Sequence, residues 1–397
     1  MKILMLTPYL PYPPSSGGQV RSYNLIKQLY KKHDITLFCY IRSDQEKKFI
    51  PELNKYCKEV RVFKRRKAWS PLNVLLAGFS PYPFLVGIYL SRHFRNSVKQ
   101  ELEKMQYDLI HCETFYVMTN IPKTNLPTIL VDQTIEYLVY QHFVKSKSFP
   151  IRLLLSIDVA KLKFWEKHFW RKASKVVAVS EGDREEMLRL APGLKPNLVP
   201  NGVDLDFFIP KKDWDAKEKR ILFVGNFKWL QNVEAAEVLV NEVFPKVKKQ
   251  LPNVKLWIVG QHAPKRVLVL KGENIIIDNL VESDVKGIKN AYNRASVFVA
   301  PVKGPGGTRL KNLAAMASRL PVVTTTIGSA GIGIKDGVDA LVRDDVGKIS
   351  DAIVEILKNP QKAKILAENA RRLAQKEYSW ETMAKKLDIV YREATRG

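Results

Sequence analysis

The chain has 397 residues, of which 46% are hydrophobic and 26% are charged, a balance that excludes a wholly disordered polypeptide. The 65 Lys and Arg residues outnumber the 40 Asp and Glu residues, and the net charge of +25 favours a partner that is anionic: nucleic acid, lipid headgroups or a phosphorylated substrate. Cys39, Cys57 and Cys112 form no CxxC pair, so we expect free thiols and a cytoplasmic location.

Short apolar runs rich in Val and Ile alternate with helical patterns, such as Val20–Lys31 and Glu234–Gln250, along most of the chain. This βαβα order predicts an α/β fold with parallel sheets, and the unbroken apolar character of the strands predicts burial on both faces. The predicted strands are Lys2–Leu6, Ile35–Cys39, Glu59–Val62, Leu109–Cys112, Thr128–Val131, Lys175–Ala178, Arg220–Val224, Lys255–Val259, Ile275–Ile277, Val297–Ala300 and Pro321–Thr324.

A segment rich in proline and polar residues, Pro196–Lys212, interrupts this alternation and predicts the boundary between two domains. We expect two doubly wound parallel-sheet domains, residues 1–198 and 199–375. A last amphipathic helix, Thr382–Ala394, lies in a C-terminal segment, residues 376–397, that we expect to pack back on the N-terminal domain.

The basic charge is concentrated near the N-terminus, where residues 1–100 hold 18 Lys and Arg but 5 Asp and Glu. The most apolar stretch, Asn73–Leu90, is interrupted by Pro81 and Pro83 and is too short for a transmembrane span. Two basic stretches with aromatic residues, Lys64–Trp69 and Lys161–Lys172, leave three alternatives open: a helix lying on anionic lipid, a core helix with a solvated basic face, or a surface that stacks single-stranded nucleic acid. We expect no nucleic-acid partner, because no known nucleic-acid-binding module accompanies them.

A glycine pair, Gly17 and Gly18, follows the first predicted strand and opens the first predicted helix. Glycine at this point lets the backbone approach a ligand, and the free N–H groups of the helix start attract a phosphate or sugar oxygen. The GxGxxG pattern of dinucleotide-binding domains is absent, and an ordinary turn remains the alternative.

A second glycine-rich turn, within Ala300–Ala317, is more informative. Arg309 and Lys311 stand at the start of the helix that follows it, where cations oppose the helix dipole unless an anion compensates them. Exposed N–H groups and two cations together predict a cradle for a diphosphate, the alternative being a solvated loop with incidental charges.

The motifs of the second half, taken with this turn, resemble those of GT-B glycosyltransferases, and more narrowly of the retaining family 4, which uses nucleotide-diphosphate sugars. The resemblance covers nearly the whole chain. The matching segments are Leu109–His111, Val177–Glu181, Asn201–Asp204, Phe223–Asn226, Trp229 with Asn232, and Ile258–Gly260.

The resemblance implies two Rossmann-like domains that face each other across a cleft, with the donor held mainly by the C-terminal one. It implies a transfer of a sugar to an acceptor hydroxyl with retention of the anomeric configuration. The basic N-terminal domain suggests that the acceptor is a glycan or a lipid-linked intermediate of polysaccharide synthesis, at the inner face of the cell membrane. The resemblance also implies that no metal or other cofactor is needed, because protein cations and helix N-termini neutralise the leaving diphosphate. Asp204 and Asp206 then belong to the interdomain connection rather than to a metal site.

The same resemblance assigns roles to individual residues. Lys311 is expected to reach the donor phosphates with Arg309 beside it. His111 corresponds to the cleft histidine near the reacting sugar, and Asp132 is a weaker catalytic candidate. The remaining candidates are the backbone amides of Gly306, Gly307 and Thr308 for the donor, and Gly17 and Gly18 for the donor phosphates or the acceptor.

Two departures from the family pattern concern the donor site. Gly306 and Ala314 occupy the positions of a Glu-x7-Glu pair whose second carboxylate holds the ribose, a loss of about 1–3 kcal/mol in donor binding. Asn226 stands after Gly225 where a basic residue is frequent, and Lys228 is its nearest substitute. Besides a full transferase, a weakly active or non-catalytic sugar-nucleotide binder, an epimerase on the same architecture and a nucleic-acid binder therefore remain as alternatives.

Overall fold

The computed structural model describes residues 1–211, 218–281, 284–304 and 309–396. It divides into two compact units, the first formed by Met1–Pro200 with Met383–Gly397 and the second by Asn201–Thr382. The division therefore falls at residues 200 and 382, close to the boundaries at 198 and 375 that the sequence suggested.

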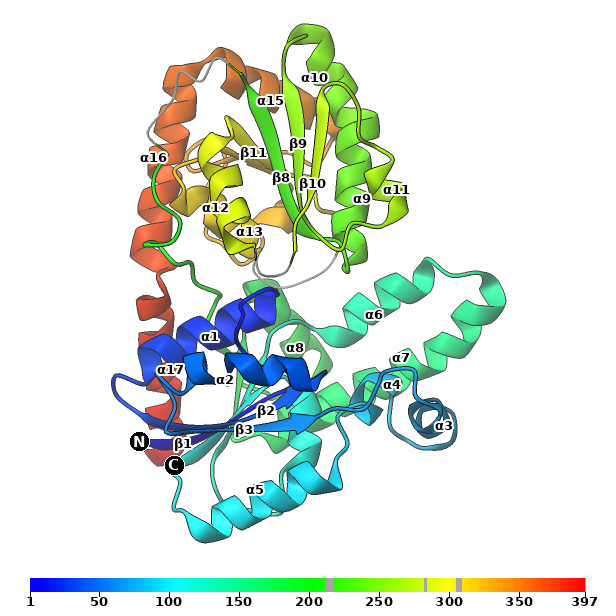
Figure 1. Ribbon diagram of the computed structural model, residues 1–397, viewed down its shortest axis with the longest axis vertical. Helices are drawn as coiled ribbons and strands as arrows, with labels where there is room; N and C mark the ends of the chain where they lie inside the picture. The colour runs from blue at the N-terminus through cyan, green and yellow to red at the C-terminus, as the bar shows by residue number, and fades with distance from the viewer. Residues whose placement is uncertain (212–217, 282–283, 305–308, 397) are drawn as a thin grey trace. The chain divides into compact units, whose positions relative to one another are not determined.

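The first unit is built on a seven-stranded sheet in the order β3-β2-β1-β4-β5-β6-β7, in which every pairing is parallel (Figure 1). The central strands are buried on both faces, as their apolar sequences require. The strands are β1 Lys2–Thr7, β2 Asp34–Ile41, β3 Glu59–Lys64, β4 Leu109–Glu113, β5 Thr128–Asp132, β6 Lys175–Ala178 and β7 Asn197–Leu198.

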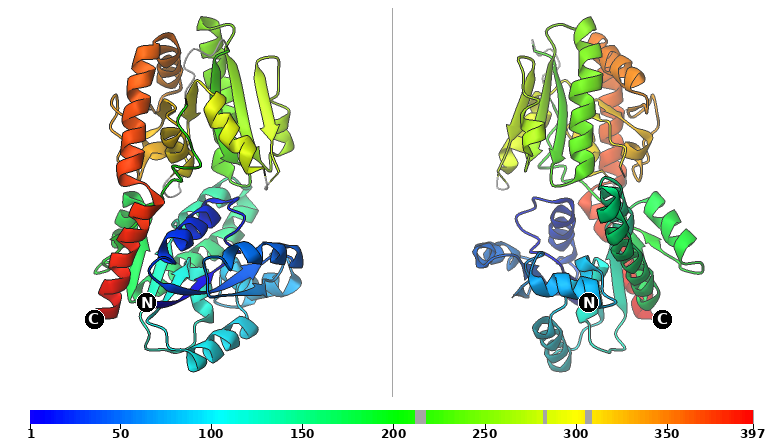
Figure 2. Two further views of the ribbon diagram at one scale, coloured as in Figure 1. Left: turned by 60° about the vertical axis from the view of Figure 1, so that its left-hand side comes forward. Right: turned by 90° about the vertical axis from the view of Figure 1, so that its right-hand side faces the viewer.

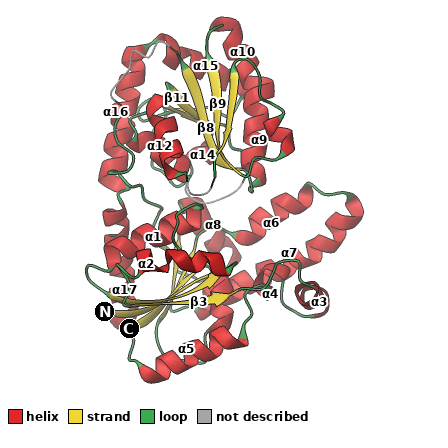
Figure 3. Ribbon diagram, viewed as in Figure 1, coloured by secondary structure: helices red, strands yellow, loops and turns green. Residues whose placement is uncertain are grey.

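Helices cover this sheet, and the 24-residue α7 is the longest of those described (Figure 3). The helices of the first unit are α1 Gly17–Leu29, α2 Ile50–Leu53, α3 Pro71–Phe79, α4 Phe84–Gly87, α5 Arg92–Lys104, α6 Glu136–Lys145, α7 Phe149–Lys172 and α8 Glu181–Leu190, with 3-10 turns at Asp44–Phe49 and Phe115–Asn120.

The C-terminal helix α17, Trp380–Arg396, returns to the first unit, so that both chain ends lie in that unit (Figure 2). Asp388 of α17 contacts His33 at 2.9 Å, and Tyr391 donates a hydrogen bond to His111 in β4 at 2.7 Å. The helix therefore contributes side chains to the interior of the first unit.

The second unit contains a six-stranded parallel sheet in the order β10-β9-β8-β11-β12-β13. Its strands are β8 Arg220–Asn226, β9 Lys255–Gln261, β10 Ile275–Asn279, β11 Val297–Ala300, β12 Val322–Thr324 and β13 Leu341–Val342. Its helices are α9 Leu230–Val238, the π-helical turn Leu239–Val243, α10 Phe244–Gln250, α11 Lys265–Leu268, α12 Val285–Arg294, α13 Leu310–Ala317, α14 Thr326–Ser329, α15 Val346–Lys358 and α16 Pro360–Glu377.

The two units share one topological feature that fixes where a ligand binds. In each sheet the chain builds outward in one direction and then resumes on the other side of the first strand, between β1 and β4 in the first unit and between β8 and β11 in the second. Connections on the two sides of this switch point diverge, which leaves a crevice at the carboxyl ends of those strands. The residues that follow β1, β4, β8 and β11 are therefore expected to border a ligand.

The sequence left two details of the elements open. The window Glu234–Gln250 is helical throughout, as predicted, but the helical structure begins at Leu230, and a π-helical turn precedes Pro245, whose missing N–H and ring cannot continue an α-helical ladder. The two-residue edge strands β7 and β13 were missed, because a pair of residues carries no detectable alternation.

Candidate active site

The start of α1, which follows β1, packs tightly against the residue that follows β5, two strands away in the sheet. Ser16 caps α1 by accepting the N–H of Gln19, and Gly17 is the exposed first residue of the helix. A Cβ on Gly18 would lie 2.4 Å from Oε1 of Gln133 and 2.6 Å from the hydroxyl of Tyr9. A side chain at residue 18 would therefore push the ends of Gln133 and Tyr9 out of their present positions, and the predicted contact of this turn with a ligand stays a prediction.

Replacing Gly18 with alanine is expected to lower transfer activity by at least about tenfold, because the added methyl group displaces Gln133 and Tyr9 from their hydrogen bonds. Steady-state kinetics on the purified variant measures the effect. Gly182→Ala in α8 is the matched control, since nothing lies within 4 Å of a Cβ there. Equal activity of the two variants would show that the packing at residue 18 does not matter for function.

A continuous chain of hydrogen bonds runs through the carboxyl end of the first sheet. Glu113, the last residue of β4, accepts from Nε2 of His111 at 3.1 Å and from the amide of Gln133, and the same amide donates to the Tyr9 hydroxyl at 2.6 Å. The chain continues from His111 to Tyr391 and from Tyr9 to Ser22, 3.0 Å away. Side chains from α1, β4, α17 and the segments that follow β1 and β5 are thus connected by polar contacts at the switch point of the sheet.

The charge at the centre of this network is the carboxylate of Glu113. Burial acts to raise its pKa, but the hydrogen bond from His111 and the positive charge of Arg21 outweigh burial and hold the pKa below its ordinary value. Arg21 is itself wholly buried, which lowers its pKa, and its Nη1 donates to the carbonyl oxygen of Pro200 at 2.9 Å. A buried guanidinium and a buried carboxylate therefore stabilise each other beneath this edge of the sheet.

The two catalytic candidates of the first unit lie inside it rather than on its surface. Both ring nitrogens of His111 are engaged, by Glu113 and Tyr391, and its side chain has no exposed area. Asp132, at the end of β5, is also wholly buried and accepts from the indole N–H of Trp170 at 2.7 Å. Burial raises the pKa of Asp132 well above its ordinary value, and its carboxyl group holds the indole of Trp170 in place.

In the second unit the carboxyl ends of β8 and β9 approach each other closely. A Cβ on Gly260 would lie 1.8 Å from the carbonyl oxygen of Gly225, and one on Gly225 would lie 3.2 Å from the side chain of Asn232. Asn232, from the start of α9, also donates to the carbonyl oxygen of Asn226 at 2.7 Å. Gly225 therefore allows α9 to approach the end of the strand.

Lys311, in the first turn of α13, extends into this corner. Its Nζ donates to Oδ1 of Asn232 at 2.6 Å and lies 4.5 Å from the centre of the Phe223 ring. In the part of the chain that the structure describes, no carboxylate forms an ion pair with this ammonium group. Burial, with a smaller contribution from the charge of Arg309, lowers the pKa of Lys311 to about 7. Among the described residues, the Lys311 side chain is therefore held by a neutral amide and an aromatic ring and has no counter-charge.

Arg309 is the N-cap residue of α13 and donates to the carbonyl oxygen of Gly304 at 2.6 Å. It therefore stands two residues from Lys311 at the positive end of the helix dipole. Gly306, Gly307 and Thr308, predicted to complete the cradle with their amides, lie outside the described residues. Two cations at one helix start define a place where a negatively charged ligand would be stabilised.

The other donor candidates differ in their exposure. Lys228 is exposed in the turn between β8 and α9, whereas Ala314 is 5% exposed and packs in the core of the second unit. Asp204 accepts the backbone N–H groups of Asp206 and Phe207 at 3.1 and 2.9 Å, which is the geometry of a turn-forming aspartate. Among the described residues no group of three His, Cys, Asp or Glu side chains is arranged to hold a metal ion.

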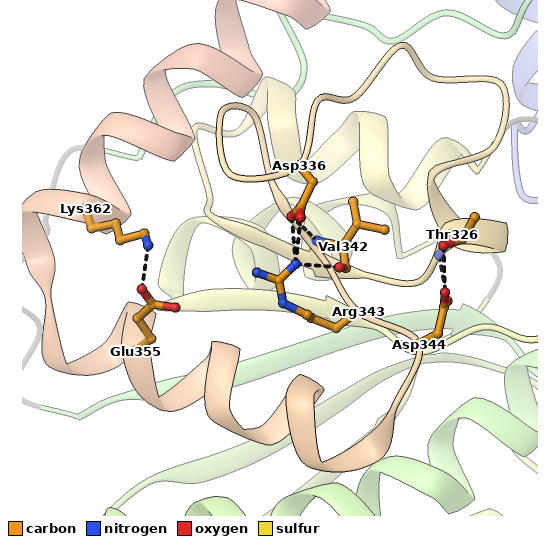
Figure 4. Close-up of polar contacts among 7 residues, drawn as sticks. All are labelled: Thr326, Asp336, Val342, Arg343, Asp344, Glu355 and Lys362. Carbon is orange, nitrogen blue, oxygen red and sulfur yellow. Dashed lines mark hydrogen bonds and ion pairs between the residues drawn. The ribbon is translucent and has the colours of Figure 1, made fainter.

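The loop after β12 is fixed on the same edge of the second sheet. Asp344 accepts from the backbone N–H and the hydroxyl of Thr326 at 2.9 and 2.7 Å, and Arg343 places one nitrogen 2.8 Å from each carboxylate oxygen of Asp336 (Figure 4). These contacts hold α14 and β13 in place, while Lys362 and Glu355 join α16 to α15. The segment that borders the carboxyl end of β12 is therefore well supported.

Several residues of these networks were not predicted. Glu113 follows His111 by two residues in a strand, so its side chain projects on the same side, and this spacing was a usable signal. Asn232 was noted as part of a motif but without a role. Tyr391 lies 280 residues from His111, and no local pattern connects them.

The fold is that of known glycosyltransferases. Sucrose-phosphate synthase from Thermosynechococcus elongatus superposes with a TM-score of 0.73 at 20% identity over 99% of both chains. Anabaena Alr3699/HepE, solved in complex with UDP-glucose, gives a TM-score of 0.67 at 15% identity over 99% of this chain and 100% of that one. Two parallel-sheet domains of this kind define the GT-B class.

Sequence comparisons point to one family within that class. The model of "Glycosyltransferase Family 4" matches residues 15–207, and that of "Glycosyl transferases group 1" matches residues 218–359. An uncharacterized 44.6 kDa protein in the cps region of Klebsiella pneumoniae is 24% identical over 95% of this chain and 96% of its own length. The phosphatidyl-myo-inositol mannosyltransferase of Mycobacterium tuberculosis is 26% identical over 49% of this chain and 53% of its length. The chain belongs to glycosyltransferase family 4 and is a glycosyltransferase.

Proposed function

We propose that this glycosyltransferase moves a sugar from a nucleotide-diphosphate donor to an acceptor hydroxyl with retention of the anomeric configuration. The observation that carries the proposal is Lys311, an ammonium group at a helix start whose partners in the described structure are the neutral Asn232 and the ring of Phe223. A diphosphate supplies the anion that this site lacks. The UDP-glucose bound by the Anabaena relative is a donor of this class.

Departure of the nucleotide leaves negative charge on the diphosphate, and groups placed before the reaction at that point lower the barrier. In the proposed reaction Lys311 and Arg309 neutralise this charge, together with the dipole of α13. The positive charges of the chain itself then perform the task that other transferases give to a bound cation, so activity is expected to survive metal chelation. Transfer assays with and without EDTA measure this, and loss of activity that added divalent metal restores would contradict it.

The pKa of Lys311 predicts that donor binding takes up a proton. The pKa is about 7 in the free protein, and a bound diphosphate stabilises the ammonium form and raises it. Because binding favours the protonated form, donor affinity is expected to fall by about tenfold for each pH unit above 7 until the pKa of the complex is reached. Calorimetric titration with UDP in buffers of different ionisation enthalpy measures the protons taken up. Binding without proton uptake at pH 8 would contradict the prediction.

For the acceptor we propose a lipid-linked or surface-polysaccharide intermediate, modified at the inner face of the cell membrane. The strongly basic N-terminal unit supports an anionic acceptor, and a mycobacterial relative that is named a phosphatidyl-myo-inositol mannosyltransferase fits an acceptor of this kind. A labelled donor incubated with candidate acceptors, followed by NMR of the product, tests both acceptor and configuration. An inverted product would contradict retention, and a donor altered without any acceptor would indicate an epimerase.

A second candidate, a weakly active or non-catalytic binder of sugar nucleotides, is favoured by Ala314 alone. Its methyl group cannot accept the ribose hydroxyls as the glutamate of the family pattern does. The variant Ala314→Glu separates the candidates. A wild-type chain that turns over donor supports the transferase, whereas a chain that binds donor but is inactive both before and after the substitution supports the binder.

A further inference from the structure

The helix α3 of the first unit is apolar on its outer side and polar on its inner side. Of its nine residues, PLNVLLAGF, the one that is buried is Asn73, which donates two hydrogen bonds of 3.1 Å to the carbonyl oxygens of Lys67 and Ala68. Leu72, Leu75 and Phe79 share one face of the helix and point outward, with Phe79 89% exposed. A helix that lies between a protein core and water normally has its apolar residues on the core side and its polar residues on the water side.

A second apolar segment lies at the N-terminal end of α7, at the tip of the hairpin that α7 forms with α6 (Figure 1). None of the first nine residues of α7, Phe149–Ile157, is buried, and Leu153 and Leu154 are 64% and 69% exposed. Soluble proteins rarely expose this many large apolar side chains on neighbouring helices without a partner. We call the exposed apolar residues of α3 and of Phe149–Ile157 together the apolar rim.

The two parts of the rim are held in a fixed arrangement. Nζ of Lys161 in α7 donates to the carbonyl oxygens of Ala77 and Ser80 at the end of α3, at 2.7 and 2.8 Å. The indole of Trp165 donates to the carbonyl oxygen of Pro81 at 2.8 Å. These hydrogen bonds therefore hold the C-terminal end of α3 against α7.

A basic hollow of about 460 Å³ adjoins α3. Lys64, Arg65, Arg66 and Arg92 line it, and Leu72 and Leu76 of α3 form part of its wall. Lys64 pairs with Asp44 at 2.7 Å, but among the described residues no carboxylate forms an ion pair with the three arginines. Guanidinium groups bind phosphate oxygens well, and in the described part of the chain these three have no carboxylate as a counter-charge.

The charge around the rim indicates which partner it fits. Residues 64–95 contain six basic residues and no Asp or Glu. Pairing of two copies through this surface would bring like charges together, whereas an anionic bilayer offers both an apolar interior and negative headgroups. The basic residues are Lys64, Arg65, Arg66, Lys67, Arg92 and Arg95.

We propose that the first unit docks on an anionic lipid bilayer, with the apolar rim inserted among the acyl chains and the hollow of Arg65, Arg66 and Arg92 holding a lipid phosphate. The inference deepens the membrane location within the proposed function by naming the surface that makes the contact. In the described part of the chain no helix is long and apolar enough to cross a bilayer.

Insertion is tested with a fluorophore on the rim. The three native cysteines are buried, so an environment-sensitive dye labels Phe79→Cys selectively, and Ile365→Cys on exposed α16 is the matched control. Vesicles of phosphatidylglycerol and phosphatidylcholine are expected to shift the emission of the dye at residue 79 to the blue and to leave that at residue 365 unchanged. No shift at residue 79, or equal shifts at both positions, would overturn the proposal.

The role of the hollow is tested by sedimentation with the same vesicles. Each basic residue near a membrane adds about fivefold to binding, so Arg65→Glu with Arg66→Glu is expected to weaken binding by at least about 25-fold. Lys248→Glu with Lys249→Glu on α10 carries the same charge change in the second unit and is expected to bind as the wild type does. Equal weakening by both pairs, binding to pure phosphatidylcholine as tight as to the mixture, or tighter retention on single-stranded RNA would contradict the proposal. The assay needs no substrate, so its failure leaves the transfer reaction untouched.

Discussion

Replacing Lys311 with alanine is expected to reduce kcat/KM for sugar transfer by about 100- to 1000-fold, the effect of removing one charge-stabilising group from a transition state. Asn232 and Phe223 position the ammonium group at the start of α13. Among the described residues, no other cation is bonded to Asn232 and stacked on Phe223 in this way. The loss is expected mainly in kcat when the leaving diphosphate carries more charge than the bound donor.

The control for this variant is Lys249→Ala, which removes an exposed ammonium group from the last turn of α10. Its activity is expected to stay within about twofold of the wild type, because an exposed surface charge contributes little. Lys311→Arg is a second control, since it keeps the charge but places a wider group against Asn232. Full activity of Lys311→Ala would remove Lys311 from the mechanism.

Replacing Glu113 with alanine is expected to destabilise the first unit by about 3 kcal/mol, because it leaves the buried guanidinium of Arg21 without its opposing charge. The same change removes the acceptor of His111 and of the Gln133 amide, so the side chains at the end of β4 lose their fixed positions. Thermal unfolding and denaturant titration measure the loss of stability, and transfer assays at low temperature measure the loss of activity.

Glu103→Ala is the matched control for that experiment. Its carboxylate is exposed on α5 and pairs with Lys99 at 3.7 Å, an arrangement that contributes at most about 1 kcal/mol. Glu113→Gln separates the effect of charge from that of shape, because glutamine has the size of glutamate but carries no negative charge. A Glu113→Ala variant as stable as Glu103→Ala would mean that Arg21 finds its counter-charge elsewhere.

The fold was predictable because its signals are local. Strands such as Leu109–Glu113 and Val297–Ala300 are continuous apolar runs, and their alternation with helical windows requires parallel sheets. The prediction of two doubly wound domains of the GT-B class is confirmed. The π-helical turn at Leu239–Val243 was not predictable, because it extends a helical pattern rather than interrupting it.

The candidate site was predictable only in its local part. Charges that oppose a helix dipole are visible in the sequence, and this signal is enough to single out Arg309 and Lys311. The partners that position Lys311 come from other elements, Phe223 from β8 and Asn232 from α9, and their approach depends on how the strands are ordered. The network of Tyr9, Glu113 and Tyr391 has the same origin, because it joins three segments far apart in the chain.

The role of Lys311 is tested most directly by a crystal structure of the protein with bound UDP. The proposed mechanism predicts a phosphate oxygen within hydrogen-bonding distance of Nζ of Lys311, with the guanidinium of Arg309 on the same diphosphate. A fully occupied nucleotide whose phosphates lie away from the start of α13, with Lys311 still bonded to Asn232, would contradict it.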